Sequence, residues 1–383
     1  MKNWICAREF SEVEPISLFK KELDEIEMFN KHNSFQNMHV LFRKKFHLNK
    51  TSLSYHLHIT ADDYYKLYIN GNFVGQGPAP SYHSSYNYNI YDITNILVDG
   101  DNTIAVHCYY QGLVNRVWNS DDLRQGLYAS LYKEDELLLT TDGSWKYTYD
   151  TSFKTIERTM GYDTQFVENI DMRERITDWK CSDFDDSAWG NAYIKENDDH
   201  TMVEQVTPPL DVYEVSPENI LCLDNHTFIL DFGKEIVAGL KLVAKGERGS
   251  KIRLLCGEEL KDNGHVRYEM RCNVCYDETW TLSGELDEIE NYDYKGFRYL
   301  EVKSEDIAIK PNQLSAMVRH YPLKHKISFH SSSDQLNKIW DICENAVIIS
   351  SQEGFLDCPT REKGQYLGDL TVTALSHTYT NFL

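Results

Sequence analysis

The fold of the first half of the chain is decided by a stretch in which apolar and polar residues alternate, Leu53-Ser54-Tyr55-His56-Leu57-His58-Ile59. Because successive side chains of a strand point to opposite faces, this period of two predicts a half-buried β-strand. Leu67-Tyr68-Ile69 and Phe73-Val74 follow, with Asn70-Gly71 between them. An Asn-Gly pair readily takes the two left-handed conformations of a type I′ turn, so residues 67–74 are predicted to form a hairpin.

The strand pattern continues on both sides of a polar region. Further strands are predicted over 103–110, 127–132 and 137–141, and a second β-rich block over 228–233, 240–244, 252–256, 279–282 and 297–302. Short strands with tight turns at this spacing are typical of antiparallel sandwiches. Pro208-Pro209 is predicted to separate the two blocks. Near the N-terminus, Phe19, Leu23 and Ile26 are spaced for one face of a helix.

The period changes again after residue 330. Ser333-Asp334 is a helix N-cap signal. The apolar residues that follow fall on one helix face: Leu336, Ile339, Trp340, Cys343, Ala346 and Val347. Gly364 and Gly368 interrupt a second helix, which is predicted to begin near Asp369. The apolar face needs a partner surface, so we expect self-association through it if it stays exposed.

These patterns predict a mainly β fold of two antiparallel, jelly-roll-like β-sandwich domains followed by the first helices of a helical domain. The predicted domains are residues 1–208, 209–325 and 326–383. The last is predicted to be the start of a larger unit, because one apolar helix face with a short remainder cannot bury itself.

Composition limits the classes of partner. The 383 residues include 60 acidic and 39 basic side chains, a formal net charge of −21. This balance argues against nucleic acid and against anionic membranes as main partners. No stretch reaches the ~18 apolar residues of a membrane span, and early charges at Lys2, Arg8 and Glu9 break up any signal-peptide core. Nine scattered cysteines agree with a reducing compartment, so we expect a cytoplasmic protein.

Aromatic residues make up 13% of the chain, with 25 Tyr, 16 Phe and 7 Trp. A β-rich fold accounts for such an excess, because aromatic residues favour strands. The alternative interpretation is sugar recognition on aromatic faces. Composition by itself favours the first.

The densest group of reactive side chains is Asp357-Cys358-Pro359-Thr360-Arg361-Glu362-Lys363-Gly364-Gln365-Tyr366-Leu367-Gly368-Asp369. Pro359 disfavours helical geometry at Cys358, so Asp357 is predicted to lie on a loop. Converging carboxylates are what glycoside hydrolysis requires, because one acid protonates the leaving oxygen while another group activates water or attacks the sugar. The other interpretation, which the pattern by itself favours, is a capped loop with structural ion pairs.

The sequence gives little support for metal or cofactor chemistry. Cys272-Asn273-Val274-Cys275 is a single CxxC, and a structural zinc site needs two more ligands at compatible spacing. The phosphate, dinucleotide, zincin and serine-hydrolase signatures GxxxxGK[ST], GxGxxG, HExxH and GxSxG do not occur. We therefore expect no metal and no cofactor.

Several stretches, in their order, resemble the bacterial α-L-rhamnosidases of glycoside hydrolase family 78. Residues 67–71 with 74–78, 91–94 with 100–102, and 184–189 resemble the N-terminal sandwich of that family. Residues 231–234, 257–260 and 296–299 resemble its second sandwich. Asp357-Cys358-Pro359, Arg361-Glu362 and Gly368-Asp369 resemble the catalytic motif. The resemblance extends over nearly the whole chain after about residue 35.

The resemblance implies a helical (α/α)6 barrel, here incomplete, and inverting hydrolysis of terminal α-L-rhamnosides without a cofactor. Carried over by position, Glu362 is the candidate general acid. Asp357 and Asp369 would hold sugar hydroxyls, and Arg361 would orient the carboxylates. The implied partner is a rhamnose-containing glycoside.

The chain departs from the family pattern after the arginine, where Glu362-Lys363-Gly364 is one residue shorter. A positive Lys363 beside Glu362 is expected to favour the ionised carboxylate. In the family the general base comes from a later part of the barrel, so we expect the chain alone not to hydrolyse glycosides efficiently. Two alternatives stay open: a non-catalytic carbohydrate-binding β-sandwich protein, and a related barrel glycosidase with another sugar preference.

Overall fold

The structure is a computed structural model that describes residues 3–14, 23–115, 117, 124–154, 159–195, 198–304, 309–323 and 327–380. It divides into two compact units, Met1–Thr151 with Ile176–Thr207, and Ser152–Arg175 with Pro208–Leu383. The segment Ser152–Arg175 therefore belongs to the second unit, although it lies between two parts of the first in sequence. The domain limits drawn from sequence stay a prediction.

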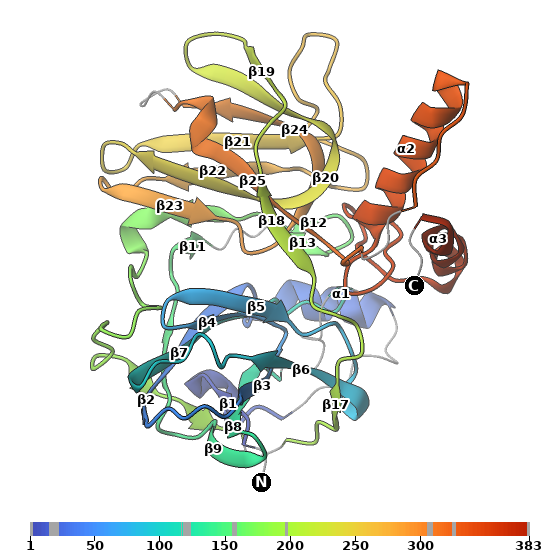
Figure 1. Ribbon diagram of the computed structural model, residues 1–383. Coiled ribbons are helices and arrows are strands. Elements are labelled where there is room, and N and C mark those ends of the chain that lie inside the picture. Colours follow the sequence, from blue (N-terminus) through green and yellow to red (C-terminus); the bar gives the residue numbers. More distant parts are fainter. Residues whose placement is uncertain are drawn as a thin grey trace. The chain divides into compact units, whose positions relative to one another are not determined.

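The first unit contains two sheets (Figure 1). The seven-stranded sheet has the order β16 (Tyr193–Ile194), β1 (Ile5–Cys6), β8 (Gly126–Lys133), β3 (Tyr55–Asp62), β6 (Tyr86–Asp92) and β17 (Met202–Glu204), with β9 (Glu136–Thr140) paired to β8. The six-stranded sheet has the order β15 (Gly190–Asn191), β10 (Lys146–Tyr149), β2 (Met38–Leu48), β7 (Gly100–Tyr110), β4 (Tyr64–Ile69) and β5 (Asn72–Gly77). The unit also contains α1 (Leu23–His32) and the 3₁₀ turns η1 (Arg8–Phe10) and η2 (His83–Ser85). All pairings in these two sheets are antiparallel except β6 with β17.

The alternating stretch forms β3 from Tyr55 onward, and its apolar residues Leu57 and Ile59 are completely buried, whereas Leu53 lies before the strand and is exposed. The predicted hairpin is confirmed as β4 and β5. Asn70 and Gly71 have φ angles of 51° and 84°, as a type I′ turn requires. The helix expected near the N-terminus is α1, but Phe19 lies outside the described residues.

The second unit is built on a sheet of ten strands. Its order is β11 (Phe153–Lys154), β14 (Asn169–Asp171), β22 (Asp277–Thr281), β21 (Lys251–Gly257), β24 (Lys295–Lys303), β20 (Thr227–Lys245), β25 (Leu314–His320) and β18 (Asp211–Val215), with β19 (Asn219–Cys222) and β23 (Leu286–Glu290) paired to β20. Beside it lie the hairpin β12 (Thr159–Met160) with β13 (Gln165–Phe166), and the 3₁₀ turns η4 (Met172–Glu174) and η5 (Pro311–Gln313).

Strand β20 corrects one expectation. Residues 228–233 and 240–244, predicted as two strands, belong to one strand of 19 residues whose register shifts between Asp231 and Ile236. Gly233 supplies a φ of +78° inside this bulge. A bulge bends a strand. Strand β20 pairs with β19 before the bulge, with β23 and β25 after it, and with β24 on both sides. One strand therefore serves both parts of the sheet.

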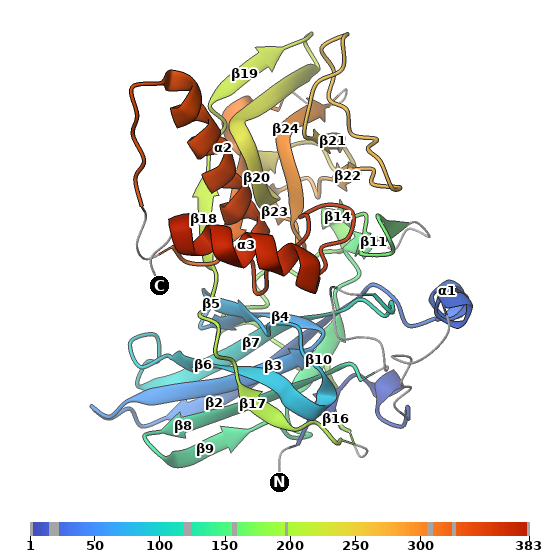
Figure 2. The same ribbon diagram turned by 90° about the vertical axis from the view of Figure 1, so that its right-hand side faces the viewer.

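Two helices complete the second unit (Figure 2). Helix α2 spans Asp334–Ser350, and the Ser333 side chain accepts a hydrogen bond from Leu336 N, as the N-cap signal predicted. Helix α3 spans Leu367–Thr380. It begins two residues before the predicted start and contains Gly368 in its first turn. The mainly β fold with the start of a helical domain is thus confirmed.

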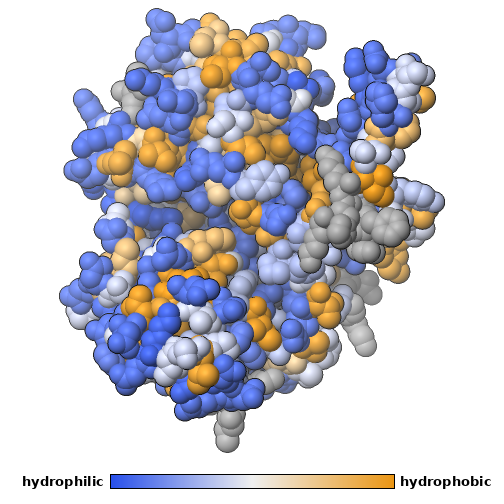
Figure 3. Space-filling model, viewed as in Figure 1, coloured by the Kyte–Doolittle hydropathy of each residue, from blue (hydrophilic) through white to orange (hydrophobic). Residues whose placement is uncertain are grey.

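The apolar face of α2 is largely exposed. Leu336 and Ile339 are 51% and 48% exposed. The side toward the sheet uses other residues: Asn345 donates to the Glu235 carbonyl oxygen at 2.9 Å, and Ile349 packs on Val237, Tyr294 and Leu356. In Figure 3, hydrophobic residues (orange) are visible on the surface in the part of the molecule that α2 occupies in Figure 1.

Candidate active-site loop

The predicted carboxylate motif lies on an irregular loop, residues 351–366, that connects α2 to α3. Two glycines of the second unit make room for it. A Cβ on Gly296 of β24 would lie 2.9 Å from side-chain atoms of Pro359 and Thr360. A Cβ on Gly161, at φ +63°, would lie 2.1 Å from the Arg361 carbonyl oxygen. The ten-stranded sheet and the β12–β13 hairpin are called the sheet unit below. Close approach of the loop to this sheet unit depends on residues without a side chain.

Asp357 closes the loop on itself. Its backbone N–H donates to the Gly364 carbonyl oxygen at 2.9 Å, and its Oδ1 accepts from Gly364 N at 3.1 Å. The Asp357 side chain is 6% exposed. Asp357 Oδ2 lies 3.7 Å from the Arg361 guanidinium. The Asp357 carboxylate is thus oriented by Gly364 at Oδ1 and by the Arg361 guanidinium at Oδ2.

Arg361 is the residue that brings the predicted carboxylates together. Its guanidinium lies 3.7 Å from Asp357 Oδ2 and 3.4 Å from Glu362 Oε1. Arg361 Nη1 also donates to the Cys358 sulfur at 3.3 Å. The neighbouring Cys358 sulfur, followed by the Asp357 and Glu362 carboxylates, raises the pKa of Arg361. A permanent positive charge therefore lies between the two acids.

Backbone bonds hold Arg361 from the opposite side. The carbonyl oxygen of Arg361 accepts from Tyr162 N at 3.0 Å and from Thr164 Oγ1 at 3.2 Å, both in the β12–β13 hairpin. Sequence reasoning missed this hairpin, because it lies about 200 residues away and has no charged motif.

Glu362, the candidate general acid, is partly open, with a side chain 20% exposed. Its Oε2 accepts a short hydrogen bond from the Tyr366 hydroxyl, and its Oε1 faces Arg361. Both carboxylate oxygens therefore have a neighbour that orients them. Tyr366 was also missed from the sequence, although a position four residues from Glu362 was a usable signal.

Lys363 does not act as the sequence suggested. Its Nζ is directed into the sheet unit, where it donates to Asp293 Oδ2 at 3.1 Å and to the Tyr294 carbonyl oxygen at 2.7 Å. The expectation that Lys363 would stabilise the charge of Glu362 is corrected: the backbone at Lys363 is left-handed, with φ +50°, and turns its side chain inward. Sequence adjacency says little about direction on an irregular backbone.

Asp369 lies in the first turn of α3 and is exposed. The structure thus brings together Asp357, Arg361 and Glu362, whereas Asp369 lies seven residues beyond Glu362, on a helix rather than on the loop. Its assignment to the sugar stays a prediction.

Two further carboxyl groups are linked electrostatically to Arg361, Glu258 directly and Glu235 through Glu258. Burial raises the pKa of Glu258, and the positive charge of Arg361 opposes that shift. Burial, with the neighbouring charge of Glu258, raises the pKa of Glu235 to about 7. The electrostatic influence of Arg361 therefore extends to Glu258, which directly follows β21 of the ten-stranded sheet. The sequence showed Glu258 only as part of a family-like stretch.

The residues of the CxxC differ in environment. Cys272 is exposed and its sulfur accepts from the Tyr162 hydroxyl at 3.3 Å, whereas Cys275 is buried. Within the described ranges, no group of three or more His, Cys, Asp or Glu side chains is arranged to hold a metal ion. Nor does any helix in that part of the chain have the length and apolar character to cross a membrane.

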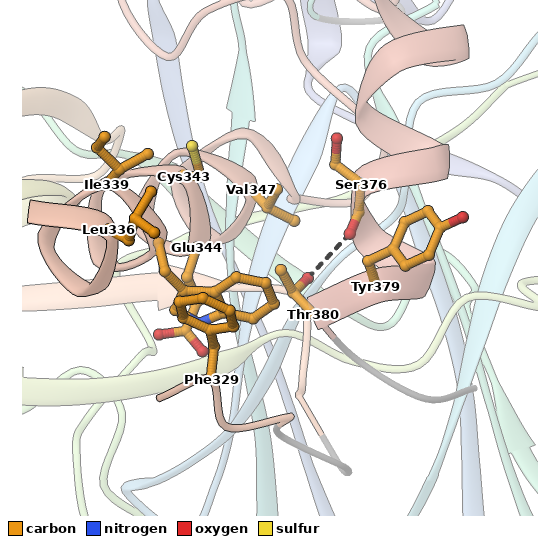
Figure 4. A pocket seen from close by; sticks show the side chains of 10 residues that line it. Phe329, Leu336, Ile339, Cys343, Glu344, Val347, Ser376, Tyr379 and Thr380 are labelled. Atoms are coloured by element: carbon orange, nitrogen blue, oxygen red, sulfur yellow. Dashed lines mark hydrogen bonds between the residues drawn. The ribbon is translucent and has the colours of Figure 1, made fainter. Parts of the chain in front are cut away.

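Two cavities lie in the second unit, and neither is lined by the predicted site residues. One, of about 370 Å³, lies between α2 and α3 and is lined by residues that include Phe329, Leu336, Ile339 and Tyr379 (Figure 4). The other, of about 230 Å³, lies between the β20 bulge, β18, β25 and α2.

Three consecutive stretches match known domains. Residues 50–214 match the alpha-L-rhamnosidase N-terminal domain, 222–320 the bacterial alpha-L-rhamnosidase concanavalin-like domain, and 324–381 the bacterial alpha-L-rhamnosidase 6 hairpin glycosidase domain. β-sheet units followed by a helix pair with a carboxylate loop are the architecture of a glycosidase with a helical catalytic domain.

The chain belongs to the bacterial α-L-rhamnosidase family. An alpha-L-rhamnosidase of Formosa agariphila is 26% identical over 363 residues, which cover 86% of this chain and 36% of that protein. The chain thus spans about a third of the length of this curated relative.

Solved structures show the same fold. The alpha-L-rhamnosidase from Dictyoglumus thermophilum has a TM-score of 0.79 at 21% identity, covering 100% of this chain and 42% of that one. The Streptomyces avermitilis alpha-L-rhamnosidase complexed with L-rhamnose has a TM-score of 0.76 at 23% identity, covering 90% of this chain and 35% of that one.

Proposed function

We propose that the chain carries the general-acid side of an inverting α-L-rhamnosidase site. Glu362 is the acid, Arg361 orients it, and Asp357 and Asp369 bind sugar hydroxyls. The observation that carries the proposal is the position of Arg361 between Asp357 and Glu362, on a loop held by the sheet unit. The proposed ligand is the terminal sugar of a rhamnose-containing glycoside.

The chemistry follows from this arrangement. Glu362 gives its proton to the glycosidic oxygen as the bond to the anomeric carbon breaks, so that the leaving group departs as a neutral alcohol. Tyr366 and Arg361 hold one carboxyl oxygen each, which limits its rotation. Inversion needs a second carboxylate ~6.5–9.5 Å away that activates water on the opposite face of the sugar.

We propose that residues 1–383 alone bind the sugar but turn it over slowly. About two thirds of the Formosa agariphila relative has no counterpart in this chain. Proton donation by Glu362 alone leaves the attacking water without a base, which removes one of two coupled contributions to the rate.

Two measurements on the chain test this proposal, with E362Q, R361M and the control E259Q. Glu259 is a matched control, because its exposed side chain pairs with Arg267 at 2.7 Å. We expect calorimetric titration to detect L-rhamnose binding that R361M abolishes and E259Q preserves. Turnover of an aryl α-L-rhamnoside should be no faster in wild type than in E362Q.

Each measurement can contradict one part of the proposal. Wild-type chain that does not bind L-rhamnose contradicts the site. Turnover at ordinary enzyme rates contradicts the proposed inactivity of the chain alone. Binding of other sugars in preference to L-rhamnose would support the alternative of another sugar preference.

We also propose a cytoplasmic location. All nine cysteines are free thiols, and their scatter over both units supports a reducing compartment. Fractionation of the producing cells, with L-rhamnose-binding activity followed in each fraction, tests this.

A further inference from the structure

The residue after the candidate acid is a buried lysine. The Lys363 side chain has no exposed surface, whereas that of Glu362 is 20% exposed. The left-handed backbone at Lys363 sends the two neighbouring side chains in different directions. A buried amine on a loop is costly unless it is paired, so its partners are informative.

Lys363 binds Asp293 and Tyr294, which directly precede β24. Its Nζ lies 3.1 Å from Asp293 Oδ2, 2.7 Å from the Tyr294 carbonyl oxygen and 3.8 Å from the centre of the Tyr294 ring. The other oxygen of Asp293 accepts from Tyr294 N at 2.7 Å. Asp293 N in turn donates to buried Glu168 at 2.6 Å. The Asp293 residue is therefore also held by hydrogen bonds that do not involve Lys363.

Arg319 connects the same tyrosine to the start of the loop. The Arg319 guanidinium lies 4.7 Å from the centre of the Tyr294 ring. Arg319 donates to Gln352 Oε1 at 3.1 Å and to both carboxylate oxygens of Glu353. Residues at both ends of the 352–363 segment are thus attached to one place on the sheet unit.

The buried groups around this place include more carboxylates than amines, and loss of Lys363 would widen that difference. Three carboxylates, those of Glu168, Glu278 and Asp293, are buried with the amines of Lys295 and Lys363. Lys295 lies 2.8 Å from Glu278. Removing the charge of Lys363 leaves Asp293 without its cation, a strongly unfavourable state for a buried carboxylate.

We propose that Lys363 and Asp293 are the positioning pair of the active-site loop. They do not touch the sugar. They fix the backbone on which Arg361 and Glu362 point toward it. This inference rests on the proposed function for its link to the sugar, whereas the anchoring itself can be measured without a ligand.

The charge of Lys363 provides a direct test. Burial lowers the pKa of Lys363 to about 8, although Asp293 opposes the shift. The other charged groups that face this region are Lys295, Arg319, Glu168, Glu278 and Glu353. Raising the pH from 7 to 9 should neutralise Lys363. In K363R the guanidinium stays charged, so K363R controls for every other group that titrates in this range.

The experiment is hydrogen exchange of the full chain, expressed as protection factors for peptides within 357–366. Because the folded pKa lies below the ~10.4 of a free lysine, the closed loop gives up this proton before the opened loop does. We therefore expect wild-type protection to rise by up to about tenfold from pH 7 to pH 9, and K363R protection to stay constant. K363M/D293N removes both buried charges, so it should remain folded while its loop protection at pH 7 is at least tenfold lower. Equal pH dependence in wild type and K363R, or wild-type protection in K363M/D293N, overturns the proposal.

Calorimetry with L-rhamnose gives the second readout. We expect K363M/D293N to weaken binding about tenfold. K241M is the control, since Lys241 is a partly exposed lysine of the same unit that pairs with Glu214 and Glu288 at 3.1 Å. K241M should leave the Kd unchanged. An unchanged Kd in K363M/D293N overturns positioning of the sugar site. If the wild-type chain does not bind L-rhamnose, the proposed function fails and the exchange data alone decide the anchoring.

Discussion

The loop at 351–366 and the two helices that flank it differ in opposite ways in backbone regularity and in side-chain burial. The loop is irregular, yet Lys363 is completely buried and Asp357 nearly so. Helices α2 and α3 are regular, yet Ile342 and Val372 are 70% and 68% exposed. Regular backbone hydrogen bonding does not by itself bury a side chain, because burial needs a partner surface. The loop has one in the sheet unit, and the outer helix faces do not have one among the described residues.

The largest effect should come from Gly161→Ala. Its Cβ would lie 2.1 Å from the Arg361 carbonyl oxygen, at a φ that alanine disfavours. We expect the loop to be displaced and L-rhamnose binding to fall at least a hundredfold by calorimetry. Gly368→Ala is the control, because nothing lies within 4 Å of its Cβ. Alanine there should stabilise α3 by up to about 1 kcal/mol. Equal binding by both variants would remove the contrast between loop and helix.

The next effect concerns the buried charges under the loop. Burial, together with Glu278 and Asp293, raises the pKa of Glu168 to about 7. A raised carboxyl pKa contributes stability below the unfolded pKa of ~4.3, and that contribution is lost as the pH rises through about 7. The free energy of unfolding of wild type minus that of E168Q should therefore decrease between pH 4.5 and 7. A difference independent of pH, measured by urea unfolding, would contradict this.

A smaller effect is expected on the exposed helix faces. Ile339→Glu places a charge on the apolar surface between α2 and α3, next to Leu336 and Tyr379. If that surface causes self-association, I339E should lower the weight-average mass at high concentration in light scattering. Loop protection and sugar binding should not change. The control is Asp341→Glu, on the same helix at an exposed position. A monodisperse wild-type monomer at high concentration would contradict the expected self-association.

The smallest effect concerns His377 of α3, which is buried between Tyr321 and Phe355, with ring centres 5.7 Å and 5.5 Å away. Burial lowers the pKa of His377 below 6.5. The unfolded imidazole then gains its proton first as the pH falls, so stability is lost below pH 6.5. We expect amide protection in α3 to decrease from pH 7 to pH 5.5 in wild type and not in H377Q. Protection of residues 357–364 should fall less over the same range.

Much of the fold could be predicted because it depends on local signals. Alternation placed β3, Asn70-Gly71 placed the hairpin, and Ser333 placed the start of α2. The bulge of β20 could not be predicted, because it depends on which strands pair on either side. Part of the candidate site could be predicted, because Asp357, Arg361 and Glu362 are close both in sequence and in space. Glu258 and the β12–β13 hairpin come from distant positions, where no local pattern indicates contact.

The sequence by itself determined which reactive side chains are present, namely the carboxylates and the arginine of the motif. It also determined the family and the order of the units. Only the tertiary structure decided what Lys363 does. From its neighbours in sequence it was expected to act on Glu362, and in the fold it binds Asp293, 70 residues away. The physical reason is that charge interactions depend on distance and burial, and a left-handed residue on a loop can direct one side chain outward and the next one inward.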